Sequence, residues 1–202
     1  MREHGASDPE RAFQTCQLAH DGWRDECIFT LAETAPMAPA EAAAWCREAG
    51  RYTISCLMHL WQVEAAAAKD ELEPEPAALR FAESLEWAGD HLDDTLRTRA
   101  WSLYYRTGLD PSTPLDAADC DALPDPHPRY CSQGTREALG RGLNVWVREN
   151  GPEALMPACE LSEADERAAF IGELTGLHYV PAAGLDAVAK QTLTRSCGMQ
   201  PR

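Results

Sequence analysis

Apolar residues recur every three or four positions along most of the chain. One stripe comprises Trp23, Cys27, Ile28 and Leu31, a second comprises Ile54, Leu57, Met58, Trp61 and Ala65, and a third comprises Leu92, Leu96, Ala100 and Leu103. This spacing is typical of amphipathic helices. β-branched residues are few and do not alternate with polar residues over the length of a strand. The pattern therefore predicts an all-α protein of about ten or eleven helices.

Residues that favour helix starts lie between these stripes. Asp8, Pro9 and Glu10 have the order of an N-cap, a first helical residue and an acid in the first turn, and Pro39 and Pro76 begin two further segments. The connections are only a few residues long, so consecutive helices should pack antiparallel. We expect stacked antiparallel helical hairpins, arranged as an irregular α-solenoid or as a bundle.

The cysteines recur with a regular spacing of ten or eleven residues: Cys16 and Cys27, Cys46 and Cys56, and Cys120 and Cys131. Cys159 has Phe170 at the same offset, and Ser84 and Thr95 take the matching positions between the second and third pairs. The starting points are separated by 30 to 39 residues. Periods of this length favour stacked helix pairs. Unrelated helices in an irregular bundle remain an equal alternative.

The same spacing favours disulfide bonds. In a helical hairpin, a residue near the end of the first helix faces one about a turn into the second, so their Cα atoms approach within the roughly 4.4–6.8 Å that a disulfide needs. Each bridge across such a short loop should stabilise the fold by about 3 kcal/mol. We predict a disulfide-stapled fold with the fourth bridge assigned by elimination: Cys16–Cys27, Cys46–Cys56, Cys120–Cys131 and Cys159–Cys197.

Metal binding is the alternative role for the cysteines. Cys16 and His20 lie four residues apart on one expected helix, and Cys56 and His59 lie three apart on another. Thiolate and imidazole are ligands that zinc prefers. Under this alternative the protein is a helical metalloprotein with zinc or another metal in a structural or catalytic site. With paired cysteines, no cofactor is expected.

The segment GDHLDD, residues 89–94, is the densest polar cluster. If it is helical, Asp90, His91 and Asp94 lie three and four residues apart and could hold a cation. The simpler interpretation is an acidic first helical turn with Asp90 as its N-cap. The cluster also supports a third hypothesis, a helical enzyme that uses these residues.

A proline-rich segment, GLDPSTPLDAADCDALPDPHPRY, covers residues 108–130. Five of the 14 prolines lie in it, which is typical of an irregular connection. We expect residues 1–202 to form one all-helical domain, or two lobes at 1–107 and 112–202 that this connection joins.

The net charge of the chain limits the classes of partner that we expect. The chain has 18 basic and 33 acidic residues and a net charge of −15. Such a charge repels phosphate backbones and anionic lipids, so we expect no nucleic-acid partner. No run of 18 apolar residues occurs, so we expect no membrane span. A protein or peptide partner of basic character suits the charge best.

The cysteines and the N-terminus point to different compartments. Paired cysteines are typical of exported proteins, periplasmic or extracellular, whereas unpaired cysteines would suit the cytoplasm. The first residues, MREHGASDPERAF, contain no apolar segment of the kind found in signal peptides. If the cysteines are paired, we therefore expect export with the signal absent from this chain.

No catalytic motif such as G-x-S-x-G or H-E-x-x-H occurs. Gly134, Gly140 and Gly142 resemble a phosphate loop only superficially, and close helix packing explains them better. Most of the six tryptophans should lie in the core, but an exposed one would mark a binding surface. The leading hypothesis is a non-enzymatic binding or scaffold protein that presents a rigid, acidic, helical-repeat surface to a protein or peptide.

Overall fold

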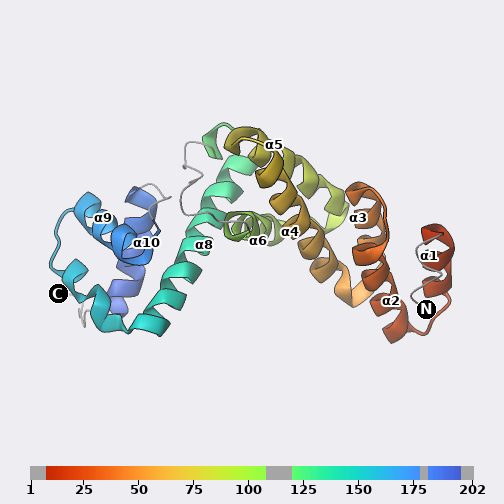
Figure 1. Cartoon of the computed structure of the whole chain (residues 1–202), viewed down its shortest axis with the longest axis horizontal. Helices are drawn as coiled ribbons and strands as arrows, with labels where there is room; N and C mark the ends of the chain where they lie inside the picture. Colours follow the sequence, from red (N-terminus) through yellow and green to blue (C-terminus); the bar gives the residue numbers. More distant parts are fainter. Residues whose placement is uncertain (1–7, 108–119, 178–181, 197–202) are drawn as a thin grey trace. The chain divides into compact units, whose positions relative to one another are not determined.

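The computed structural model describes residues 8–107, 120–177 and 182–196, and these residues form helices and turns without β-strands. Contacts divide the chain into two compact units, Met1–Thr107 and Gly108–Arg202. Within the units, consecutive helices pack against each other as hairpins, and three disulfides link them (Figure 1). The predicted class, an all-α fold of disulfide-stapled helical hairpins, is confirmed.

The described helices of the first unit are α1 (Pro9–Gln17), α2 (Asp21–Thr34), α3 (Pro39–Arg47), η1 (Gly50–Tyr52), α4 (Thr53–Glu71), α5 (Pro74–Leu85), η2 (Glu86–His91) and α6 (Asp94–Arg106). Those of the second unit are α8 (His127–Asn150), η3 (Pro152–Cys159), α9 (Ala164–Thr175) and α10 (Ala182–Ser196). The predicted irregular connection extended to residue 130, but α8 already begins at His127.

The expected helix starts are largely present. Asp8 accepts a hydrogen bond from the backbone N–H of Arg11 at 3.0 Å, and Pro9 is the first residue of α1. Pro39 begins α3. The prediction for α5 was two residues late, because this helix begins at Pro74 and includes Pro76 in its first turn. Both prolines are tolerated there because the first backbone N–H groups of a helix have no intrahelical acceptor.

The first two disulfides each join the end of one helix to the first or second turn of the next. Cys16–Cys27 links α1 to α2 with a Cα–Cα distance of 5.4 Å, and Cys46–Cys56 links α3 to α4 at 5.3 Å. Ser84 and Thr95, at the matching positions, lie on α5 and α6, each of which packs mainly against α4. The cysteine spacing therefore follows the hairpins of the first unit.

Aromatic side chains connect neighbouring hairpins in the first unit. Phe13 of α1 stacks on Trp45 of α3, with ring centroids 4.7 Å apart. Trp61 of α4 is fully buried, and its indole N–H donates to the carbonyl oxygen of Ser84 at 3.0 Å. A second cluster contains Phe81, Trp101, Tyr104 and Tyr105, which are all buried between α5 and α6. These contacts supply the apolar burial that stabilises short helices.

Charged side chains tie α4 to both of its later neighbours. The Lys69 ammonium donates to the carbonyl oxygens of Tyr104 at 2.5 Å and Thr107 at 2.7 Å, at the C-terminal end of α6. Burial lowers the pKa of Lys69 to about 8. Arg80 of α5 binds the buried Glu64 of α4 at 2.5 Å, and this hydrogen bond is the main reason that the pKa of Arg80 is raised.

The core of the second unit lies where α8, η3, α9 and α10 meet. Its buried side chains include Leu139, Leu143, Leu155, Ile171, Leu185, Val188 and Leu193. At its edge, the guanidinium of Arg167 lies 2.6 Å from the Asp186 carboxylate, which Lys190 also contacts at 3.0 Å. Burial by itself would raise the pKa of Asp186, but the hydrogen bonds from Arg167 and Lys190 outweigh it, so that pKa is lowered.

The third disulfide, Cys120–Cys131, holds the chain before α8 against the second turn of that helix, with a Cα–Cα distance of 5.6 Å. The fourth predicted bridge, Cys159–Cys197, includes Cys197, which lies outside the described residues. That pairing therefore stays a prediction.

Candidate interaction surface at the first hairpin

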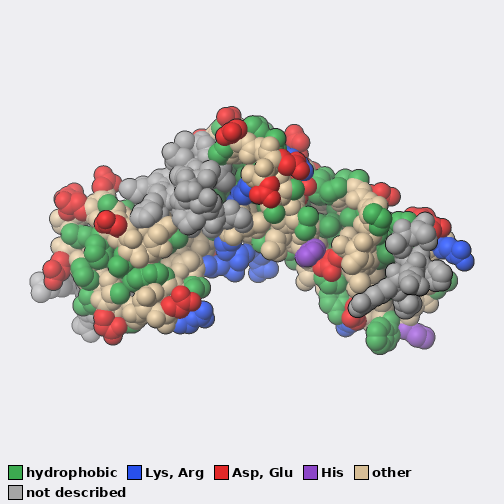
Figure 2. Space-filling view, in the orientation of Figure 1, with side chains coloured by type: hydrophobic (Ala, Val, Ile, Leu, Met, Phe, Trp, Pro, Cys, Tyr) green, Lys and Arg blue, Asp and Glu red, His purple; other side chains and the backbone are tan. Residues whose placement is uncertain are grey.

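Two large apolar side chains project into solvent near the connection between α1 and α2. Leu18, the C-cap of α1, is 88% exposed, and Trp23, in the first turn of α2, is 73% exposed. In Figure 2, hydrophobic side chains stand out at the end of this hairpin. We refer to Leu18 and Trp23 together as the apolar tip. The tip is the most exposed apolar feature among the described residues.

The prediction that Trp23 shares one helix face with Ile28 and Leu31 was wrong. On α2 the buried residues are Ile28, Leu31 and Ala32. At about 100° per residue, Trp23 lies roughly 140° around the helix from Ile28, so it points away from the core while Ile28 is buried. The stripe combined spacings of four and five residues, and a spacing of five rotates a residue well away from the face that its neighbours share.

Arg51 of η1 makes hydrogen bonds to residues on both sides of Trp23. The Arg51 guanidinium donates to the carbonyl oxygen of Gly22 at 3.3 Å, and the Arg51 backbone N–H donates to Asp25 Oδ2 at 3.2 Å. These two bonds attach the first turn of α2 to the segment that leads into α4. The pattern of neighbouring residues in the sequence could not predict these two hydrogen bonds, because the partners are 26 and 29 residues apart.

Further contacts hold the base of the tip. The Cys16–Cys27 disulfide joins α1 to α2 on either side of Leu18 and Trp23. Arg24 lies 3.8 Å from Glu48, an exposed pair that adds little stability. Because the base is cross-linked, a partner that buries the tip has little backbone to order on binding.

The part of the chain that carries the tip is acidic. Residues 8–53 contain eight acidic and four basic side chains. Three of those arginines already have partners: Arg24 contacts Glu48, Arg47 donates to the carbonyl oxygen of Trp87, and Arg51 donates to that of Gly22. The local field therefore favours a cationic rim on whatever covers the tip.

The four candidate zinc ligands do not come together at one site in the described part of the chain. The sulfur atoms of Cys16 and Cys56 are bonded to other cysteines, so they can bind zinc only after reduction. His20 is exposed at the N-cap position of α2, and His59 Nδ1 lies 3.6 Å from Glu33 Oε1. Throughout the described part of the chain, no group of three or more His, Cys, Asp or Glu side chains is arranged to hold a metal ion.

The expected helical spacing of Asp90, His91 and Asp94 was wrong. Asp90 and His91 end the 3₁₀ segment η2, in which Gly89 has a φ of +54°, and α6 begins only at Asp94. The N-cap is Asp93 instead of Asp90, and its carboxylate accepts from the backbone N–H of Leu96 at 2.7 Å. Asp90 and Asp94 therefore do not share a helix face.

No helix in the described part of the chain is both long and apolar enough to cross a membrane. Comparisons with protein families, with characterised proteins and with solved structures gave no match.

Proposed function

We propose that this protein is a non-enzymatic binding protein of an oxidising, exported compartment, which inserts the apolar tip into a pocket of a basic protein partner. The observation that carries the proposal is the 73% exposure of Trp23 on a cross-linked hairpin. Tryptophan is enriched among the residues that dominate binding energies, because its large ring buries much apolar area with few rotatable bonds.

The disulfides support the compartment. Three bridges link the described hairpins, and bonds of this kind persist where thiols are not kept reduced. They also support the binding role, since a rigid surface loses less conformational entropy on association than a mobile one.

Charge supports the class of partner. The net charge of −15 opposes association between two copies of this chain and attracts a cationic surface. A basic partner would therefore associate faster at low salt than at high salt, because the Debye length falls from about 8 Å at 0.15 M to about 3 Å at 1 M.

The test is site-specific photo-crosslinking in an exported protein fraction, followed by affinity measurements. Trp23 is replaced by the photoreactive amino acid p-benzoylphenylalanine, and Val63, an exposed apolar residue of α4, receives the same replacement as the matched control. We expect one basic protein to crosslink at position 23 and not at position 63.

The purified partner then allows a quantitative test. Trp23→Ala should weaken its binding by about 30-fold, the loss that corresponds to about 2 kcal/mol at a binding hot spot, and Val63→Ala should not. The proposal is wrong if Trp23→Ala changes the affinity less than twofold. It is also wrong if the crosslinked species is a second copy of this chain, or if half-molar salt leaves the association rate unchanged.

A further inference from the structure

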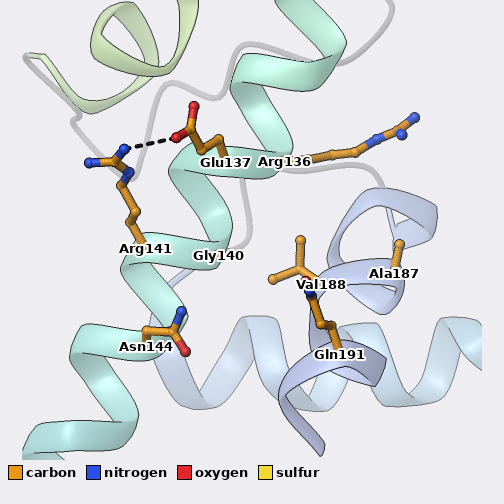
Figure 3. A pocket seen from close by; sticks show the side chains of 8 residues that line it. All are labelled: Arg136, Glu137, Gly140, Arg141, Asn144, Ala187, Val188 and Gln191. Atoms are coloured by element: carbon orange, nitrogen blue, oxygen red, sulfur yellow. Dashed lines mark hydrogen bonds and ion pairs between the residues drawn. The ribbon is translucent and has the colours of Figure 1, made fainter. Parts of the chain in front are cut away.

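A groove lies in the second unit between α8 and α10, away from the apolar tip in sequence and in a different unit. Its lining residues come from one face of each helix: Arg136, Glu137, Gly140, Arg141, Asn144, Ala187, Val188 and Gln191 (Figure 3). Its volume of about 520 Å³ lies within the range of about 300–1,000 Å³ that is usual for ligand sites.

The floor of the groove is apolar. Gly140 of α8 lies opposite Val188 of α10, and a Cβ atom added at Gly140 would be 3.8 Å from Val188 Cγ1. Because position 140 carries no side chain, the floor remains open along α8. The rims are exposed, so the groove suits a chain that lies along it better than an enclosed small molecule.

The rims are polar and cationic, in contrast to the chain as a whole. Two arginines, Arg136 and Arg141, and one glutamate, Glu137, line the groove, whereas the net charge of the whole chain is −15. Arg141 lies 2.8 Å from Glu137, one turn away. In the part of the chain that the structure describes, the Arg136 guanidinium has no hydrogen-bond or ion-pair partner, and Figure 3 shows it extending away from Glu137.

The remaining rim residues provide both donors and acceptors. The side-chain amides of Asn144 and Gln191 lie on opposite sides of the groove, one on α8 and one on α10. A primary amide can pair with both the N–H and the C=O of a peptide backbone. An arginine without a partner is suited to a carboxylate because its planar fork can donate two parallel hydrogen bonds.

We infer that this groove binds an extended acidic peptide segment of a partner protein. An acidic side chain of the peptide pairs with Arg136, an apolar side chain covers Gly140 and Val188, and the peptide backbone bonds to Asn144 and Gln191. This surface is independent of the apolar tip, which favours a basic partner, so the two inferences can fail separately.

The test uses the oxidised full-length protein and three fluorescein-labelled nonapeptides. All three alternate leucine with a second residue, which is glutamate, glutamine or lysine. We expect fluorescence anisotropy to show that the glutamate peptide binds at least tenfold more tightly than the lysine peptide. Equal binding of the glutamate and glutamine peptides would overturn the inference, because the charge on the peptide would then contribute nothing.

Two matched pairs of variants locate the site. Arg136→Gln should weaken binding of the glutamate peptide at least fivefold, whereas Arg148→Gln, an exposed arginine of the same helix outside the groove, should change it less than twofold. Equal effects of these two variants would overturn the inference.

Gly140→Ala and Gly142→Ala form the second pair. Both replace a glycine within α8, and neither added methyl group would clash, since the nearest side-chain atoms are 3.8 Å and 3.6 Å away. Both variants should therefore melt at a higher temperature than the parent protein. Only Gly140→Ala should weaken peptide binding, by about threefold, because Gly142 faces Leu177 and not the groove. If the two variants bind the peptide alike, the groove is not its site.

Discussion

The Asp25 carboxylate lies directly against the backbone of Gly50. A Cβ atom at position 50 would be only 2.5 Å from Asp25 Oδ2, the same oxygen that accepts a hydrogen bond from the backbone N–H of the next residue, Arg51. Gly50 also has a φ of +51°, which L-residues with side chains seldom adopt. Glycine at this position therefore lets the carboxylate of α2 reach the start of η1, which anchors the base of the apolar tip.

Gly50→Ala should destabilise the first unit by about 2 kcal/mol or more, because backbone strain and the clash with Asp25 add together. The measurement is the free energy of unfolding from urea titration. Gly176→Ala is the matched control: Gly176 also has a positive φ, of +71°, but an added Cβ would have no atom within 4 Å. If both variants lose the same stability, the contact between Asp25 and Gly50 contributes nothing.

The disulfides predict the mass and the stability of the native protein. Non-reduced, denatured protein should weigh about 6 mass units less than the fully reduced protein and take up two alkyl groups if it has three bridges, or weigh about 8 units less and take up none if Cys159 and Cys197 also pair. Cys46→Ala combined with Cys56→Ala should lower the free energy of unfolding by about 3 kcal/mol. Eight alkylated thiols together with bound zinc would instead support the metalloprotein alternative.

The ion pair between Asp186 and Arg167 predicts a loss of stability in acid. Because the pKa of Asp186 is lower in the folded protein than in the unfolded chain, its contribution is fully present above the unfolded value of about 3.9. That contribution disappears as the pH falls through the folded pKa. Asp186→Asn should lower the free energy of unfolding at pH 7 by about 1–3 kcal/mol.

Urea titrations of the Asp186→Asn variant at neutral and acidic pH measure this dependence. The difference in stability between the variant and the parent should shrink as the pH decreases. Asp165→Asn, at an exposed position of α9, serves as the control and should have a much smaller effect at pH 7. A difference for Asp186→Asn that does not depend on pH would contradict the role of its charge.

Lys69 should titrate near pH 8. Burial disfavours its charged form, so between about pH 8 and 10.4 the unfolded chain holds a proton that the folded protein has released. Through this group, stability therefore rises with pH across that interval. The chain contains only two lysines, Lys69 and Lys190, so reductive ¹³C-methylation followed by NMR titration resolves both. Lys69→Arg assigns the signals, and a Lys69 midpoint above 10 would contradict the effect of burial.

Trp23 should dominate the quenching of tryptophan fluorescence by acrylamide. Trp45, Trp61 and Trp101 are buried, so a small polar quencher reaches them slowly. Trp23→Phe should therefore remove most of the readily quenched emission without changing the melting temperature. Trp61→Phe, as the control, should leave that emission in place and lower the melting temperature. If Trp23→Phe leaves the quenching unchanged, Trp23 is not exposed in solution.

The sequence alone determined the helical class and the local pairings. Helix starts such as Asp8-Pro9 depend on residues that are neighbours along the chain, and three disulfides follow from a spacing of ten or eleven residues across a short turn. These features involve contacts that close small loops, so little besides local geometry decides them. The fold class could for this reason be predicted from the spacing of apolar residues and from the residues that begin and end helices.

Only the tertiary structure decided which faces of the helices are covered. Trp23 belongs to an apolar stripe, yet it is exposed because the buried face of α2 is centred on Ile28 and Leu31. The contacts of Arg51 with Gly22 and Asp25, and the groove between α8 and α10, join residues that are 26 or more positions apart. Such contacts depend on how separate helices pack, and the periodicity of a single helix carries no information about its neighbours.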